Sequence, residues 1–242
     1  MPQPLTRVRL MTYNIRLGLD GPDLASLAAA VRAAGVPDLL ALQEIGVGWR
    51  MGEPVDQPAV LAAALDLPYH AFAGALTDDA GGRFGVALLS RWPLCAVDVS
   101  LLPLEVDEQR VALRVAVDTE PRLWIVNTHL SIRAPERLRQ AERVGRLFAE
   151  CPGPRVLMGD LNDTPDGPAL AALAAHGGGV DLFDAGGEGP PLTFSVKQPN
   201  RRIDYLRCAG GLVPSGPARV LTDVRTSDHF PLVGAVEHVP PS

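Results

Sequence analysis

Short apolar runs recur along almost the whole chain, and several of them alternate with other side chains. In the first run, Val8, Leu10 and Thr12 alternate with Arg9 and Met11. A two-residue period is typical of a β-strand, because successive side chains point to opposite faces of a sheet. Similar runs predict strands at residues 7–15, 39–43, 86–89, 109–117, 123–126, 155–158, 203–206 and 232–236.

Helical spacing of apolar residues is found in fewer segments. Leu24, Leu27 and Val31 predict a helix that ends at Gly35, and residues 60–65 and 135–149 predict two more. Many strands with few intervening helices argue against a strict doubly wound parallel sheet and indicate two packed sheets with helices outside. No stretch rich in Pro, Gly or Ser is long enough to divide the chain, so residues 1–242 are interpreted as one domain.

The composition of the chain excludes some classes of protein. The apolar fraction of 47% is ordinary for a globular chain, and no apolar run approaches the ~20 residues that span a bilayer. Without a signal-peptide pattern, we expect a cytoplasmic protein whose thiols at Cys95, Cys151 and Cys208 are reduced and mostly buried. The net charge of −6 makes a nucleic-acid partner possible but not favoured.

Several predicted strands end in polar residues that suit a core poorly. These residues are Asn14, Glu44, His129, Asp160, Asn162, Asp204, Asp228 and His229. Strand ends are where α/β folds gather catalytic groups, so we expect all of them to line one cleft, with His129 at its wall. Taken singly, each has an ordinary explanation, such as a turn former at Asn14 or a helix cap at Asp160.

A group of converging carboxylates and histidines indicates a metal-assisted reaction. Four carboxylates at one edge would repel one another unless a cation lay among them. Oxygen-rich ligands suit a hard ion, Mg²⁺ or Mn²⁺, and such an ion beside His and Asp favours phosphoester hydrolysis. The sequence contains none of the GxxxxGK[ST], HExxH, GxSxG or GxGxxG patterns that would indicate other chemistries.

Six short motifs follow one another along the chain. They are Met-Thr-Tyr-Asn-Ile at 11–15, Leu-Gln-Glu at 42–44, Asn-Thr-His-Leu at 127–130, Gly-Asp-Leu-Asn at 159–162, Arg-Ile-Asp-Tyr at 202–205 and Ser-Asp-His at 227–229. In this order they resemble the motifs of the endonuclease/exonuclease/phosphatase superfamily. The resemblance implies a four-layer α/β sandwich made of two packed mixed β-sheets flanked by helices. It also implies a phosphodiesterase or phosphatase that depends on a divalent metal.

The same resemblance implies roles for the polar residues. Glu44 would be the principal metal ligand, with Asn14 and Asp228 nearby. Asp160 would orient or deprotonate the attacking water, and Asn162 would hold the nucleophile or the phosphoryl oxygens. Asp204 would pair with His229, and His129 would contact the phosphate. The resemblance leaves open whether Asp160 or the Asp204–His229 pair is the base, and whether one or two metal ions bind.

The substrate class stays open in the sequence. Arg83, Lys197, Arg201 and Arg202 are candidate substrate contacts, although each is equally well explained as a solvated loop charge. The arginines of segment 133–146 alternate with Glu136 and Glu142, which favours a solvated helix face over a nucleic-acid patch. A small or lipid-derived phosphoester is preferred. A nuclease and a non-catalytic binding protein on the same fold are the alternatives, and no protein partner is inferred.

Overall fold

A computed structural model of the chain describes residues 2–239 and contains two β-sheets packed face to face. The eight-stranded sheet has the order β12-β15-β16-β2-β3-β5-β4, with β14 paired to β16. Its strands are β2 (Arg7–Asn14), β3 (Leu39–Val47), β4 (Tyr69–Thr77), β5 (Arg83–Ser90), β12 (Gly187–Glu188), β14 (Leu212–Pro214), β15 (Ala218–Val220) and β16 (Leu232–His238). The order places β2 and β3, which end in predicted site residues, in the middle of this sheet.

The six-stranded sheet has the order β11-β13-β10-β9-β7-β6. Its strands are β6 (Leu94–Leu101), β7 (Val111–Val117), β9 (Leu123–His129), β10 (Arg155–Asp160), β11 (Val180–Asp181) and β13 (Asp204–Ala209). A short parallel pair joins β1 (Gln3–Pro4) to β8 (Thr119–Glu120). Both large sheets are mixed, since β2 and β3 pair in parallel, as do β9 and β10, among antiparallel neighbours.

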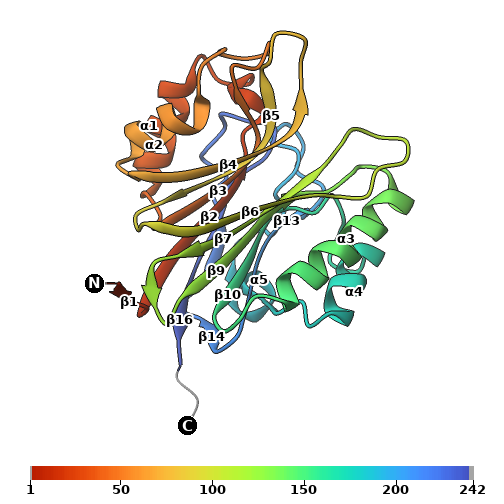
Figure 1. Cartoon of the computed structure of the whole chain (residues 1–242). Coiled ribbons are helices and arrows are strands. Elements are labelled where there is room, and N and C mark those ends of the chain that lie inside the picture. Colours follow the sequence, from red (N-terminus) through yellow and green to blue (C-terminus); the bar gives the residue numbers. More distant parts are fainter. Residues whose placement is uncertain (1, 240–242) are drawn as a thin grey trace.

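Helices cover both outer faces of the sheets, as Figure 1 shows. α1 (Leu24–Ala34) and α2 (Gln57–Leu65) lie against the eight-stranded sheet, and α3 (Ala134–Ala149) and α4 (Pro168–Ala175) against the six-stranded sheet. α5 (Leu182–Gly186) and the 3₁₀ helix η1 (Arg16–Gly18) are shorter. The predicted arrangement of two packed mixed sheets flanked by helices is confirmed.

Three apolar layers hold the four layers of backbone together. Strand β2 shows how the sequence builds them, because Leu10 points between the sheets while the next residue, Met11, points toward α1 and α2. On the other side, Val144 and Phe148 of α3 pack on the six-stranded sheet. All four side chains are at most 1% exposed. The sheets therefore form a fixed platform for whatever lies at their edge.

Helix boundaries follow local signals in the sequence. The Asp23 carboxylate accepts a hydrogen bond from the Ser26 amide at 2.7 Å and caps α1, which ends at Gly35 with a φ of 96°. Asp56 caps α2 in the same way through Ala59. Because of this cap, α2 begins at Gln57 rather than at residue 60, where the apolar spacing predicted its start.

The sequence prediction missed β4, β6 and α4. Strand β6 lies at an edge of the six-stranded sheet and is mostly exposed, so it lacks the burial pattern that identifies a strand. Strand β4, an edge strand of the other sheet, alternates small residues with Phe72 and Leu76. The predicted loop at 186–191 is wrong at its start, because Gly186 ends α5 and 187–188 form β12.

The thiols follow the prediction at two of three positions. Cys151 and Cys208 are buried, whereas Cys95 on β6 is exposed because this edge strand has no layer over it. All three are free thiols. Within residues 2–239, no helix has the length and apolar character needed to cross a bilayer.

Candidate active site

Five strands bring polar residues to one edge of the sandwich. Asn14, His129 and Asp160 are the last residues of β2, β9 and β10. In the pairing register, Asp160 lies opposite His129 on the parallel strand β9 and opposite Asp204 on the antiparallel strand β13. Glu44 lies in β3 at a bulge between Gln43 and Ile45. Residues far apart in sequence thus meet at this edge, because β2, β9 and β10 end there and the antiparallel strand β13 begins there.

A polar bridge joins the two sheets directly beneath this edge. Gln43 of β3 donates to the amide oxygen of Asn127 on β9 at 2.8 Å and lies next to the Thr12 hydroxyl of β2. The Asn127 amide nitrogen in turn donates to the backbone carbonyls of Leu42 and Ala87. All three side chains are fully buried and hydrogen-bonded. The bridge therefore sets the relative position of the two sheets where the site residues emerge.

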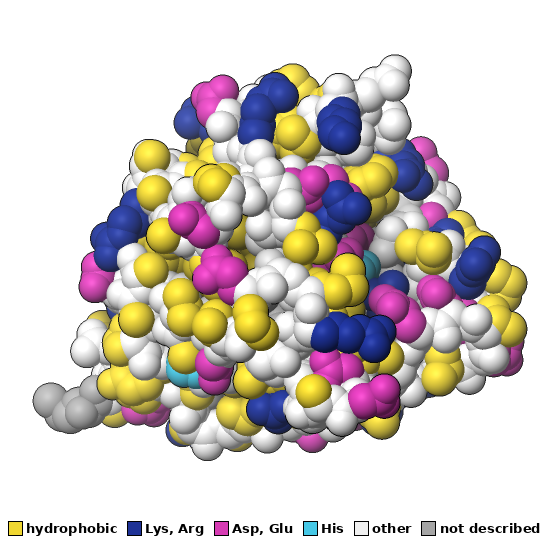
Figure 2. All heavy atoms as spheres, turned by 90° about the horizontal axis from the view of Figure 1, so that it is seen from above, with side chains coloured by type: hydrophobic (Ala, Val, Ile, Leu, Met, Phe, Trp, Pro, Cys, Tyr) yellow, Lys and Arg dark blue, Asp and Glu magenta, His cyan; other side chains and the backbone are white. Residues whose placement is uncertain are grey.

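The polar residues surround a cleft of about 450 Å³. Its lining consists of Glu44, Arg110, His129, Ile132, Arg137, Asp160, Asn162, Phe194, Arg201, Ile203, Asp228 and His229. Seen from above in Figure 2, acidic, basic and histidine side chains lie side by side in a hollow on this face. Asn14 and Asp204 are buried one step behind the lining, in contact with residues that form it.

His229 and Asp204 form a tight pair in one wall of the cleft. The Nδ1 atom of His229 lies 2.9 Å from an Asp204 carboxylate oxygen, and its Nε2 atom lies 3.6 Å from Asp160. Burial opposes a charge on the ring, but Asp204 and Asp160 outweigh it and raise the pKa of His229 to about 10. His229 is therefore an imidazolium at neutral pH, whose Nδ1–H donates to Asp204 and whose Nε2–H faces Asp160.

His129 has the opposite character on the other wall. An Arg110 guanidinium nitrogen lies 2.8 Å from Nδ1 of His129, and a guanidinium only donates, so Nδ1 must accept. Burial, Arg110 and His229 together hold the pKa of His129 well below its ordinary value. The ring is neutral, and its single proton lies on Nε2, which is 3.4 Å from an Asp160 oxygen.

Asp160 lies at the centre of these contacts. Its carboxylate accepts from the Asn162 backbone amide at 2.9 Å and from the Asn14 side chain at 3.1 Å. Burial and the neighbouring Asp204 raise the pKa of Asp160 to about 7, although His229 and these hydrogen bonds pull it down. A carboxylate with this pKa is suited to gaining and losing a proton near neutral pH.

Two site residues have a left-handed backbone that non-glycine residues rarely adopt. The φ angles are 51° at Glu44 and 50° at Asn162. Glu44 takes this conformation at the β3 bulge, and Asn162 takes it in the turn after β10. The Asn162 side chain then donates to the Leu130 carbonyl at 2.9 Å and lies 3.0 Å from Nε2 of His129. Such backbone strain clusters at functional sites because it aims side chains that regular structure would not.

Glu44 and Asp228 present carboxylate oxygens to the cleft, and Asp228 forms a long ion pair with Arg16. One Glu44 oxygen accepts from Asn14 at 2.9 Å, and the nearest Arg16 nitrogen lies 3.8 Å from Asp228. Burial raises the pKa of Glu44, and Asp228 adds to this effect against the Asn14 hydrogen bond. Both residues offer carboxylate oxygens, which are the ligands that suit a hard divalent cation.

The buried group of Asp160, Asp204 and His229 is a different arrangement. Its ligand atoms lie within 4.8 Å of one another. The two carboxylates favour a proton on His229, and a bound metal would have to displace it, because a metal ligand must be a neutral imidazole. Glu44 and Asp228 offer carboxylate oxygens without such a proton, and they are the other residues of the cleft that could hold a metal.

Of the four predicted substrate contacts, the structure brings only Arg201 into the cleft. Its guanidinium lies 4.8 Å from the centre of the Phe194 ring, which also lines the cleft. Lys197 lines a neighbouring hollow together with Arg16, Arg225 and Asp228. These two residues stay candidate contacts.

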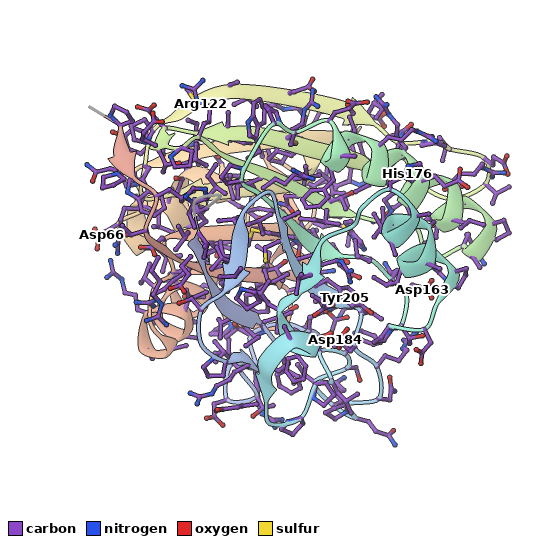
Figure 3. All side chains as sticks on the ribbon, turned by 90° about the horizontal axis from the view of Figure 1, so that it is seen from below. Asp66, Arg122, Asp163, His176, Asp184 and Tyr205 are labelled. Atoms are coloured by element: carbon purple, nitrogen blue, oxygen red, sulfur yellow. The ribbon has the colours of Figure 1, made fainter. Side chains whose placement is uncertain are left out.

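The structure places Arg83 and Arg202 outside the cleft. Arg83 points to the Phe72 ring on β4. Arg202 is 5% exposed and forms ion pairs with Asp181 and Asp184 over the Tyr205 ring; Asp184 and Tyr205 are labelled in Figure 3. The buried Asp181 requires a cationic partner, and this explains why Arg202 turns away from its neighbour Arg201.

Two arginines of the cleft were not identified from the sequence. Arg110 precedes β7 and looked like one polar residue of an alternating strand. Arg137 of α3 was expected on a solvated helix face, which is wrong: its side chain is only 12% exposed and donates to the Ser131 and Ile132 carbonyls. No sequence signal distinguishes Arg137 from the other arginines of this helix, because the choice depends on which end of α3 approaches the strand edge.

Comparison with known proteins identifies this combination of fold and strand-edge site. The sequence profile described as the Endonuclease/Exonuclease/phosphatase family matches residues 11–229. The chain belongs to this family. No curated protein matches it in sequence.

Solved structures share the fold at low sequence identity. An endonuclease/exonuclease/phosphatase from Beutenbergia cavernae has a TM-score of 0.79 at 24% identity, covering 96% of this chain and 72% of that one. Sphingomyelinase C from Streptomyces griseocarneus has a TM-score of 0.73 at 20% identity, covering 95% and 99%. The mannosyl-6-phosphatase Bt3783 of Bacteroides thetaiotaomicron also has a TM-score of 0.73, at 19% identity, covering 96% and 100%. At these identities the likeness concerns the fold.

Proposed function

We propose that the chain is a divalent-metal-dependent hydrolase of phosphoester bonds that acts on a small or lipid-derived substrate. The observation that carries this proposal is the arrangement around Asp160. A carboxylate with a pKa of about 7 lies between a charged His229 and a neutral His129, in a cleft that also holds Glu44 and Asp228. Family membership and the names of two structural relatives, a phosphatase and a sphingomyelinase, support the same class of reaction.

Glu44 and Asp228 would hold the metal, with Asn14 fixing the Glu44 carboxylate through its 2.9 Å hydrogen bond. The amide oxygen of Asn14 already accepts from the Arg16 backbone, which favours a positioning role over the direct ligand role expected from the sequence. A bound Mg²⁺ or Mn²⁺ would neutralise phosphate charge and polarise the phosphorus centre. The choice between the two ions is part of the test below.

Asp160 is the best candidate for the base that takes a proton from the attacking water. His229 already carries its proton at neutral pH, because its pKa is about 10, so it is unable to accept another. Asp160, with a pKa of about 7, exists partly as carboxylate at that pH. His229 then acts as the charged donor, and Asp204 holds its ring in place through the 2.9 Å contact at Nδ1.

The remaining polar groups of the cleft would contact the phosphoryl group. Nε2 of His129 lies 3.0 Å from the Asn162 side-chain nitrogen and 3.4 Å from an Asp160 oxygen. Arg110 and Arg201 add positive charge to the lining. Donors fixed in advance stabilise the charge that develops on phosphoryl oxygens without reorganisation during the reaction.

The experiment is hydrolysis of bis-p-nitrophenyl phosphate with Mg²⁺ or Mn²⁺ and with a chelator. Wild type is compared with Asp160→Asn and Glu44→Gln, and with Arg83→Gln, whose side chain points away from the cleft. We expect metal-dependent turnover that falls by about 100-fold or more in the first two variants and is retained in Arg83→Gln.

The control outcomes separate the alternatives. Turnover that survives both substitutions would place the chemistry elsewhere and contradict the proposed site. If wild type fails on the diester with either ion, a panel of phosphomonoesters is tested in the same way. Failure on both panels would favour the non-catalytic binding protein.

A further inference from the structure

A second cavity adjoins the catalytic cleft on the side of β3 and β5. It has a volume of about 510 Å³ and shares Glu44 with the cleft. Its apolar lining includes Trp49, Leu76 and Phe84, and Leu19 and Met51 lie at its edge with 45% and 50% of their surface exposed. We call this cavity the side pocket. Apolar side chains that are exposed beside a polar cleft are unusual enough to require an explanation.

The side pocket is a built feature rather than a gap between mobile loops. The Trp49 ring is 7% exposed and packs against Phe84, with 5.6 Å between the ring centres. Below it, the fully buried Gln57 side chain accepts from the Gly46 amide and donates to the Leu17 carbonyl. These hydrogen bonds tie η1, β3 and α2 together, so the pocket has a fixed shape before a ligand enters.

Charge distinguishes the side pocket from the neighbouring hollow that contains Lys197. The lining of the side pocket has four carboxylates, at Glu44, Asp78, Asp79 and Glu108, against two guanidinium groups. The neighbouring hollow instead has Arg16, Lys197 and Arg225 against two carboxylates. The acidic groups of the side pocket repel a chain of phosphates, and its aromatic and aliphatic side chains offer contact to an apolar group.

We propose that the side pocket binds the non-reacting ester group of a phosphodiester substrate, and that this group is apolar, uncharged and free of phosphate. The inference rests on the proposed hydrolase function and names the substrate class of that site. The shared Glu44 makes the pocket continuous with the reacting centre, and its volume lies within the range of about 300–1,000 Å³ that accommodates small ligands. An aryl group would lie against Trp49 and Phe84, with Met51 and Leu19 at its edge.

The test compares two diesters that share the p-nitrophenolate leaving group. Methyl p-nitrophenyl phosphate leaves the side pocket empty, whereas 1-naphthyl p-nitrophenyl phosphate fills it. In wild type we expect the naphthyl ester to have a kcat/KM at least about tenfold higher, corrected for the uncatalysed rates, because apolar contact contributes about this much discrimination. The ratio should fall below about twofold in Met51→Asp and in Leu19→Asp.

Both substituted side chains are half-exposed, so neither change should unfold the chain. The matched control is Val99→Asp on β6, which is 47% exposed and lies outside both cavities. The control should keep the wild-type ratio. A wild-type ratio near one, or a ratio that Met51→Asp and Leu19→Asp leave intact, would overturn the inference, as would faster hydrolysis of an oligonucleotide than of the naphthyl ester.

A binding measurement separates failure of the inference from failure of the proposed function. If wild type hydrolyses neither diester, calorimetric titration with 1-naphthylphosphonate and methylphosphonate replaces kinetics. Tighter binding of the naphthyl compound that is lost in Met51→Asp but kept in Val99→Asp would support the side pocket even though the diesterase proposal had failed. Equal affinities for the two phosphonates in wild type would overturn it.

Discussion

The two walls of the cleft contain the same residue type in opposite charge states. In the wall at the end of β9, His129 lies against the guanidinium of Arg110, the residue before β7, and is neutral. In the wall at the start of β13, His229, from the segment before β16, lies against the Asp204 carboxylate and is charged. Both rings are buried, and both approach the same Asp160 oxygen, at 3.4 and 3.6 Å. Burial alone would make both neutral, so the difference comes from the group behind each ring.

This comparison shows how one carboxylate can have two histidine neighbours with different tasks. The neutral His129 offers a single proton at Nε2, whereas the charged His229 brings a full positive charge. With two charged rings, the pKa of Asp160 would be pulled down, and it would be a poor base. With two neutral rings, nothing would balance Asp204 beside it. The asymmetry is consistent with the pKa of about 7 at Asp160.

The largest effect on catalysis is expected from a substitution behind the charged His229. Asp204→Asn keeps the shape of the side chain but removes the charge that holds the His229 proton. We expect kcat for the best phosphoester substrate to fall by about 100- to 10,000-fold, the range for a lost general acid or its partner. Because the Asp204 charge raises the pKa of His229 to about 10, the same variant should shift the basic limb of the pH–rate profile to lower pH. An unchanged profile would show that the pair does not act on the reaction.

A substitution behind the neutral His129 should have a smaller effect on catalysis. Arg110→Gln removes the guanidinium from Nδ1 of His129, so the pKa of His129 should rise toward its ordinary value, although burial still holds it down. We expect about a tenfold loss of kcat, typical of a residue that positions another. NMR titration of the His129 ring checks the pKa, with Arg110→Lys as the variant that retains the charge. A ring that titrates as in wild type would contradict the role given to Arg110.

The smallest effect concerns the dependence of stability on pH, which should have opposite signs for the two rings. The raised pKa of His229 stabilises the fold fully below about 6.5, and this contribution is lost as pH rises through about 10. The lowered pKa of His129 contributes above about 6.5 and is lost as pH falls. Urea unfolding from pH 7.5 to 10 should therefore show a steeper loss in wild type than in Asp204→Asn. Parallel curves would mean that His229 is not held charged.

Local patterns in the sequence predicted much of the fold. Alternation identified β2 and β7, and the spacing of apolar residues with a final glycine identified α1. The sequence prediction failed at the sheet edges, because β4 and β6 lack a fully buried face and therefore lack a clear alternation of apolar residues. A strand is predicted from the apolar residues that it buries, and an edge strand buries too few of them.

The candidate site divides in the same way. Each polar strand end was recognisable, since a carboxylate after an apolar run requires a reason. The neighbouring arginines show the limit, because Arg201 lines the cleft while Arg202 is buried against Asp181. Two adjacent arginines look alike in the sequence. Only the packing around β11 and α5 shows that one is buried and the other lines the cleft.

The sequence by itself thus determined the central strands, their polar ends, the family they indicate and, through that resemblance, the pairing of Asp204 with His229. These depend on the chemistry and spacing of nearby residues and on the order of the motifs. Only the tertiary structure decided that Arg110 lies behind His129, that Asn14 connects Glu44 to Asp160, and that an apolar pocket adjoins the cleft. The reason is physical: a charge state depends on the distance and burial of partners that are remote in sequence, and these are set when the two sheets pack.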